Sequence, residues 1–108
     1  MMEEKQYRQL VAETYKKLER AFDDVDPDVV EVSRAGDVVT MTFPDGMRCI
    51  LSPQPPLRQL WVAARASAVH FNWDEAASAW RDDQGRGLEL WGYLRDLVKA
   101  EVGEEVAL

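Results

Sequence analysis

The sequence predicts an α+β fold, in which two helices at the ends of the chain pack on one face of an antiparallel sheet of about six strands. Near both ends, apolar residues recur every three to four positions, the spacing of an amphipathic helix. Between these stretches the chain consists of short β-branched runs separated by turn residues. Because terminal amphipathic helices must bury their apolar faces, we expect a two-layer αβ sandwich, formed as a single domain over residues 1–108.

The first helix is expected over residues 3–23, before Pro27, which a helix interior excludes. Its apolar stripe consists of Tyr7, Leu10, Val11, Tyr15, Leu18 and Phe22. The second helix is expected from about Leu90 to near Gly103, and we expect residues 103–108 to be loosely held.

The six strands are expected at residues 29–33, 38–43, 47–52, 57–64, 68–73 and 79–82. Alternation within the second run places Val39, Met41 and Phe43 on the core face and the two threonines between them on the open face. Three prolines between residues 53 and 56 lack the N–H donors of a sheet ladder. We therefore expect residues 52–56 to form a stiff bend outside the sheet.

The charge balance excludes some partner classes. A net charge of -7 and a pI of about 4.6 argue against nucleic acid, because binding to phosphates requires Lys and Arg. No apolar run approaches the roughly 20 residues of a membrane helix. The N-terminal residues resemble neither a secretory signal nor a transit peptide, so we expect a cytoplasmic protein. A basic protein surface or cations remain as partners.

Acidic side chains are concentrated between the end of the first helix and the first strand, where Arg20 is the one basic residue. We call these six residues the acidic ridge: Glu19, Asp23, Asp24, Asp26, Asp28 and Glu31. Like charges at close range repel, which suggests an external counter-charge, either a metal ion or arginine side chains. Exposed carboxylates suit hard cations but bind them weakly, and composition does not distinguish iron from calcium or manganese. The alternative is a solvated acidic face that keeps the protein soluble.

Other candidate residues are isolated. Trp61 faces either outward, as a partner contact beside Gln59, or inward, as part of the core, and the pattern leaves both open. His70 is expected on the polar face as a bystander, and Cys49 as a small buried residue. The sequence contains no motif typical of nucleophilic, zinc or nucleotide chemistry.

One stretch is more specific than these patterns. Residues 54–63, read as Gln-Pro-Pro-Leu-Arg-Gln-Leu-Trp-Val-Ala, match the signature NxQxPxxQ[ILV]W[LV][AS] of the frataxin family from its third position, with Ser52 in place of the asparagine. Val69, His70, Phe71 and Trp80 match the strands that follow. The chain therefore resembles the frataxin family over nearly its whole length.

The resemblance implies a protein of iron-sulfur cluster assembly that binds Fe²⁺ and Fe³⁺ weakly, with all six residues of the acidic ridge as the metal site and no organic cofactor. It implies docking on a cysteine desulfurase through Glu19, Asp23, Asp26 and Glu31, and contact with the iron-sulfur scaffold protein through Gln59 and Trp61. We expect a regulator or iron adaptor that is a monomer alone and not an enzyme. Two rival readings remain: ferroxidase or iron-storage activity at the same ridge, and a purely electrostatic interaction module whose metal binding is incidental.

Overall fold

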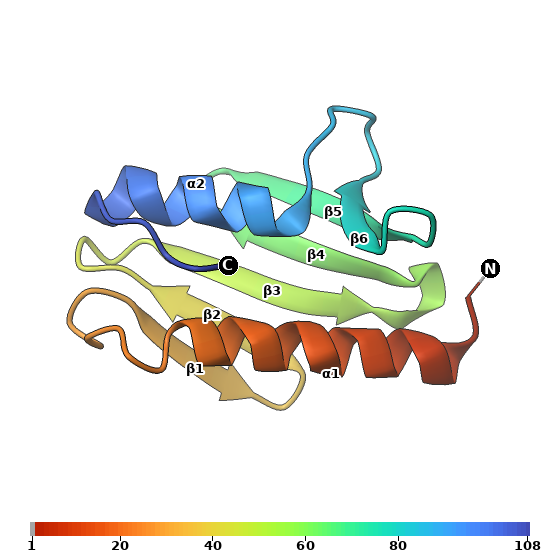
Figure 1. The fold of residues 1–108 in the computed structure, drawn as a ribbon, viewed down its shortest axis with the longest axis horizontal. Helices are drawn as coiled ribbons and strands as arrows, with labels where there is room; N and C mark the ends of the chain where they lie inside the picture. The colour runs from red at the N-terminus through yellow and green to blue at the C-terminus, as the bar shows by residue number, and fades with distance from the viewer. Residues whose placement is uncertain (1) are drawn as a thin grey trace.

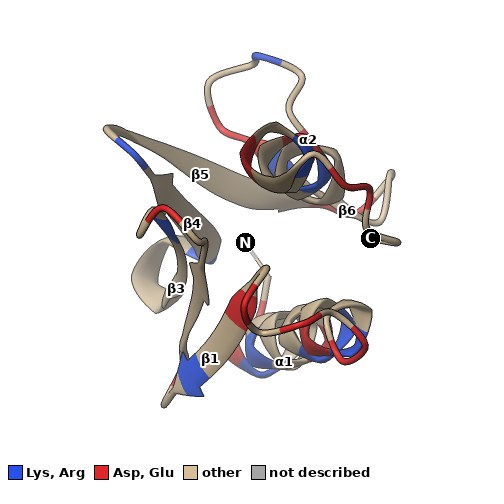
Figure 2. Cartoon of the chain, turned by 90° about the vertical axis from the view of Figure 1, so that its left-hand side faces the viewer, with Lys and Arg blue, Asp and Glu red and all other residues tan. Residues whose placement is uncertain are grey.

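The computed structural model describes residues 2–108 as two helices and one six-stranded sheet (Figure 1). The elements in order are α1 (Glu4–Ala21), β1 (Glu31–Ala35), β2 (Val38–Thr42), β3 (Arg48–Gln54), the 3-10 turn η1 (Pro55–Leu57), β4 (Gln59–Ala64), β5 (Ser67–Asp74), β6 (Ala79–Asp82) and α2 (Leu90–Val102). Every strand pairs antiparallel with the next in the chain, so the sheet is a meander. Both helices lie on the same side of it (Figure 2), which confirms the expected αβ sandwich.

The apolar stripe of α1 contributes one side of the core. Tyr7, Val11, Tyr15 and Leu18 are buried at helical spacing, and Phe22 is buried directly after the helix ends. From the other end of the chain, α2 buries Leu90, Leu94 and Val98. Each helix thus covers the sheet with a single apolar stripe.

The core face of the sheet follows the predicted alternation. Val39, Met41 and Phe43 are fully or almost fully buried, whereas the intervening threonines lie on the open face. The face without helices remains exposed to solvent, and Ile50 on β3 is one of the large apolar residues found there.

Several strand boundaries differ by one or two residues from those expected, and three of these differences concern the turns around the strands. β1 begins at Glu31, because the N–H groups of Val29 and Val30 both donate to the carbonyl of Asp26 in a preceding turn. β4 begins at Gln59, after η1.

The third difference is that β3 continues through Pro53, although we expected a bend there. Pairing with β2 ends at Leu51, so at Pro53 only β4 lies alongside, and the missing N–H removes no bond to β2.

Buried hydroxyl and indole groups fasten α1 to the sheet. The hydroxyl of Tyr7 donates to the carbonyl of Gln59 at 2.6 Å and accepts from the N–H of Gln54 at 2.9 Å. Trp80 on β6 donates its indole N–H to the Thr14 hydroxyl at 3.0 Å. These bonds fix the helix against the end of β3, the beginning of β4 and β6, which determines where the end of α1 meets β1.

The segment after Gly103 folds back toward the core instead of extending away from it. Val106 and Leu108 pack against the core, and the Arg95 guanidinium donates to the carbonyl of Leu108 at 2.7 Å. The C-terminus lies between the two helices (Figure 1), so the expectation of a loosely held tail is wrong for this segment.

Candidate functional site

The acidic ridge lies where the end of α1 meets the beginning of β1, at one end of the molecule (Figure 2). Glu19 is in the last turn of α1, and Glu31 begins β1, opposite Thr42 in the strand register. The other four acids belong to the connecting turns, because the helix ends at Ala21. Of the six carboxylates, the helix therefore carries one.

Three of these acids surround a shallow hollow of about 270 Å³. Glu19, Asp23 and Glu31 contribute its carboxylates, and the other lining residues, Phe22, Val25, Pro27, Val30 and Val32, are apolar. Among residues 2–108, no group of three or more His, Cys, Asp or Glu side chains is placed to hold a metal ion. The hollow thus brings negative charge together without forming a closed ligand cage.

Two ridge acids already have partners within the chain. Glu19 accepts a hydrogen bond from the Arg34 guanidinium at 3.1 Å, and both side chains are about 40% exposed (38% and 39%). An Asp26 carboxylate oxygen accepts from the N–H of Asp28 at 2.9 Å, which closes the turn before β1. Arg34 is absent from our sequence-based site, because local composition between residues 19 and 31 does not reveal a base that is brought near by strand pairing.

A second cluster of polar contacts occupies the open face of the sheet. The Trp61 indole is half-buried there and stacks on the His70 imidazole, with ring centroids 4.0 Å apart and planes 10° from parallel. Trp61 Nε1 donates to Gln59 Oε1 at 2.8 Å. Trp61 thus faces outward. His70, which we expected from the sequence to be a bystander, is in direct contact with it.

Gln59 is 9% exposed and its side chain is bonded within the sheet. Its amide nitrogen donates to Asn72 Oδ1 at 3.1 Å and to Asp83 Oδ2 at 3.2 Å. Asn72 and Asp83 could not be identified as partners of Gln59 from the sequence, because they are distant from it in the chain and belong to no motif. The strand register, which pairs Gln59 with Asn72, is the signal that identifies the first of them.

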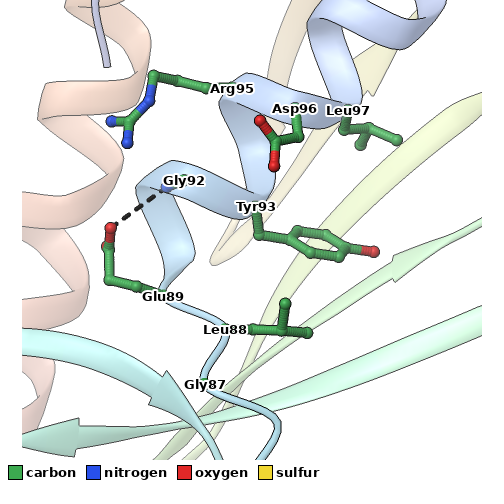
Figure 3. A pocket seen from close by; sticks show the side chains of 8 residues that line it. All are labelled: Gly87, Leu88, Glu89, Gly92, Tyr93, Arg95, Asp96 and Leu97. Atoms are coloured by element: carbon green, nitrogen blue, oxygen red, sulfur yellow. Dashed lines mark hydrogen bonds between the residues drawn. The ribbon is translucent and has the colours of Figure 1, made fainter.

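A larger hollow, of about 520 Å³, lies beside the first turn of α2 (Figure 3). Two of its charged side chains, Glu89 and Arg95, make hydrogen bonds that serve the fold. The Glu89 carboxylate accepts from the N–H groups of Trp91 and Gly92, and Arg95 binds the chain terminus. The Cys49 thiol is also unsuited to chemistry, because burial raises its pKa to about 12 and keeps it neutral.

The chain thus represents a class of αβ sandwich proteins. Its members have an antiparallel meander covered on one face by two terminal helices, and this chain has an acid-lined hollow at one end. Residues 1–104 match the family model described as the frataxin-like domain. The chain belongs to this family. No helix among the described residues is long and apolar enough to cross a membrane.

The chain is similar to bacterial proteins of nearly the same length. It is 42% identical over 105 residues to the iron-sulfur cluster assembly protein CyaY of Pseudomonas aeruginosa, covering 97% of this chain and 95% of that one. To the protein of the same name from Tolumonas auensis it is 37% identical over 107 residues, covering 99% of both.

Solved structures agree on the fold. Frataxin from Psychromonas ingrahamii superposes with a TM-score of 0.87 at 25% identity, covering 97% of this chain and 96% of that one. Trimeric frataxin from Saccharomyces cerevisiae, complexed with ferrous iron, gives a TM-score of 0.65 at 21% identity, covering 96% of this chain and 89% of that one. The yeast likeness supports the fold alone.

Proposed function

We propose that this chain is an iron-binding regulator and iron adaptor of iron-sulfur cluster assembly, which docks on a cysteine desulfurase through the acidic ridge. Its membership in the frataxin-like family and the names of its bacterial relatives support the pathway. The observation that supports the location of the site is the hollow lined by Glu19, Asp23 and Glu31. The net charge of -7 supports binding to a basic partner or a cation. Such a role requires binding and no catalytic group, so we propose that the protein is not an enzyme.

Iron is the cargo in this proposal. Carboxylate oxygens are hard donors and fit Fe²⁺ and Fe³⁺, and Asp24, Asp26 and Asp28 extend the ridge beyond the hollow. Because no three carboxylates among the described residues converge on one point, each ion keeps most of its waters. Binding should be weak and reversible, which suits a protein that passes iron on or senses it.

Docking on the desulfurase uses the same carboxylates as partners for arginine side chains. Glu19 already pairs with Arg34, so an arriving arginine must compete with that bond, and we expect Asp23, Asp26 and Glu31 to contribute more. Trp61, with Gln59 beside it, provides a separate contact with the scaffold protein. We place this assembly in the bacterial cytoplasm, with the protein a monomer before it docks.

A purely electrostatic module, with incidental metal binding, is the second candidate. The absence of a convergent ligand set among residues 2–108 favours it. Ferroxidase or iron-storage activity has less support, because enzymes of that type hold iron with paired Glu-x-x-His motifs and this chain has one histidine.

The docking proposal is tested by a charge-reversal variant, Glu19→Lys with Asp23→Lys and Asp26→Lys, in a desulfurase binding and activity assay. The matched control is Glu13→Lys with Asp96→Lys and Glu104→Lys, which changes net charge equally at exposed positions outside the ridge. We expect the ridge variant to lose about tenfold or more in affinity and the control to lose much less, since close charge pairs contribute more than distant ones. Equal losses in the two variants would show that net charge alone steers the partner.

Iron binding is tested separately, by titrating Fe²⁺ without oxygen into ¹⁵N-labelled protein. Paramagnetic broadening should appear first at amides between residues 19 and 31, and replacing Asp23 and Glu31 with the corresponding amides should reduce it. If the backbone amide signals of residues 19–31 do not respond to Fe²⁺ while the desulfurase still binds, the proposal of an electrostatic module replaces that of an iron adaptor. Oxygen consumption above that of buffer and abolished by the same substitutions would favour the ferroxidase.

A further inference from the structure

The Trp61 side chain is held on two sides. The His70 imidazole covers one face of the indole at 4.0 Å, from the position directly opposite in the β4–β5 register. On its edge, the indole N–H donates to Gln59 Oε1 at 2.8 Å. Since a half-buried tryptophan on an open sheet face otherwise has rotamer freedom, these two contacts restrict it to one orientation.

The groups that hold Trp61 also hold each other. Asp83 Oδ2 accepts from the Gln59 amide at 3.2 Å and lies 3.6 Å from His70 Nδ1. The backbone N–H of Asp83 donates to the carbonyl of His70 at 2.8 Å. A closed set of contacts therefore runs from Trp61 through Gln59 and Asp83 to His70 and back to the indole.

This arrangement limits how a partner can meet the ring. The indole has a single donor, and Gln59 already accepts from it. Both amide hydrogens of Gln59 are likewise committed, to Asn72 and Asp83. On the side of Trp61 away from Gln59, the open face is apolar, because Ile50, which is 37% exposed, pairs with Ala63, and Ala63 pairs with Ala68. On β3, Ser52 pairs directly with Trp61.

We propose that His70 and Gln59 are positioning residues, which hold the Trp61 ring ready for a partner that contacts it through a flat or apolar group and not through a hydrogen bond to the indole. This inference rests on the proposed contact between Trp61 and the scaffold protein. It changes the role of Gln59 from a residue that touches the partner to one that acts through Trp61. Fixing the ring in advance lowers the entropy cost of docking, which is about 0.5–1.5 kcal/mol for one side chain.

The positioning role is tested on the free protein with the Trp61 indole N–H resonance, assigned from its loss in Trp61→Phe. In His70→Ala we expect faster exchange of this proton with water and a lower heteronuclear NOE, because the stacking partner is gone. His70→Phe restores a flat ring and should return both values toward wild type. Thr40→Ala, on the open face of β2, is the control and should leave the resonance unchanged. An unchanged indole in His70→Ala would overturn the inference.

Affinity for the scaffold protein separates this inference from the function on which it rests. His70→Ala should weaken binding about two- to tenfold, the fold-change that corresponds to that entropy cost, and His70→Phe should recover it. If Trp61→Ala abolishes binding while the loosened His70→Ala binds as wild type, positioning has no role. If the indole loosens and neither variant changes affinity, positioning stands and the scaffold contact fails. Tighter binding by Gln59→Met, which releases the indole N–H, would show that the partner uses that donor.

Discussion

At the scale of single residues, the bond between Thr14 and Trp80 connects α1 to the last strand of the sheet. Trp80 is 1% exposed and its indole N–H donates to Thr14 Oγ1 at 3.0 Å, while that hydroxyl donates to the carbonyl of Leu10 at 2.7 Å. Thr14→Val keeps the shape but leaves the buried indole N–H without an acceptor. We expect the free energy of unfolding to fall by about 1–3 kcal/mol, measured by urea denaturation.

A double-mutant cycle with Trp80→Phe identifies the source of this loss. Because Trp80→Phe removes the donor, adding Thr14→Val should then cost much less than it does in the wild type. Additive losses would mean that the bond contributes nothing. Thr40→Val, at a half-buried position on the open face, should be nearly neutral by comparison.

The side of the sheet that a residue faces could be predicted from the sequence where one local pattern determined it. Alternation identified Val39, Met41 and Phe43 as core, and the family signature identified Trp61 as outward. The partners of those residues could not be predicted. Arg34 reaches Glu19 because α1 lies across β1, a contact between two elements that neither local sequence specifies.

At the scale of elements, the two helices begin differently. The N-cap residue of α2 is Glu89, whose side chain accepts from the N–H groups of Trp91 at 2.8 Å and Gly92 at 3.2 Å. At the same position in α1, the Glu3 side chain makes no capping hydrogen bond to the first turn of the helix. Substitution of a residue that caps a helix in this way costs about 0.5–2 kcal/mol.

We therefore expect Glu89→Ala to lower the free energy of unfolding by about 1 kcal/mol and Glu3→Ala to lower it by a few tenths at most. Thermal or urea denaturation of the two variants side by side measures the difference. Both substitutions remove one negative charge at a helix N-terminus, so a general charge effect predicts equal losses. Equal losses would contradict the capping role of Glu89.

Element boundaries followed the sequence where turn residues determined them. The strand expected at residues 79–82 is β6, Ala79–Asp82. The extension of β3 through Pro53 depended on the end of β2 at that point, which is a property of the sheet and not of the proline. The first helix was expected to reach residue 23 but ends at Ala21, and Asp26 lies in a turn in which it is bonded to Asp28.

At the scale of the whole molecule, burial of ionisable groups connects stability to alkaline pH. Burial raises the pKa of the Cys49 thiol from its ordinary 9.0 to about 12, and it is also the main reason that the pKa values of Tyr7, Tyr15 and Tyr93 lie above their ordinary 10.0. Below about pH 9 these groups carry their protons in both the folded and the unfolded chain. Above that pH the unfolded chain releases protons that the folded chain retains, so stability falls as pH rises.

Cys49 alone should cost about 2 kcal/mol of unfolding free energy between pH 8 and pH 10.5, because each pH unit above the unfolded value contributes about 1.4 kcal/mol. Urea denaturation at pH 8, 9.5 and 10.5 measures the decline. Cys49→Ala should start less stable, because it leaves a small cavity, but decline less steeply, since of the four groups named above only the three tyrosines remain to ionise. The added negative charge of the whole protein at high pH affects the wild type and Cys49→Ala alike. Parallel declines in the stability of the two proteins would therefore show that the thiol does not titrate with unfolding.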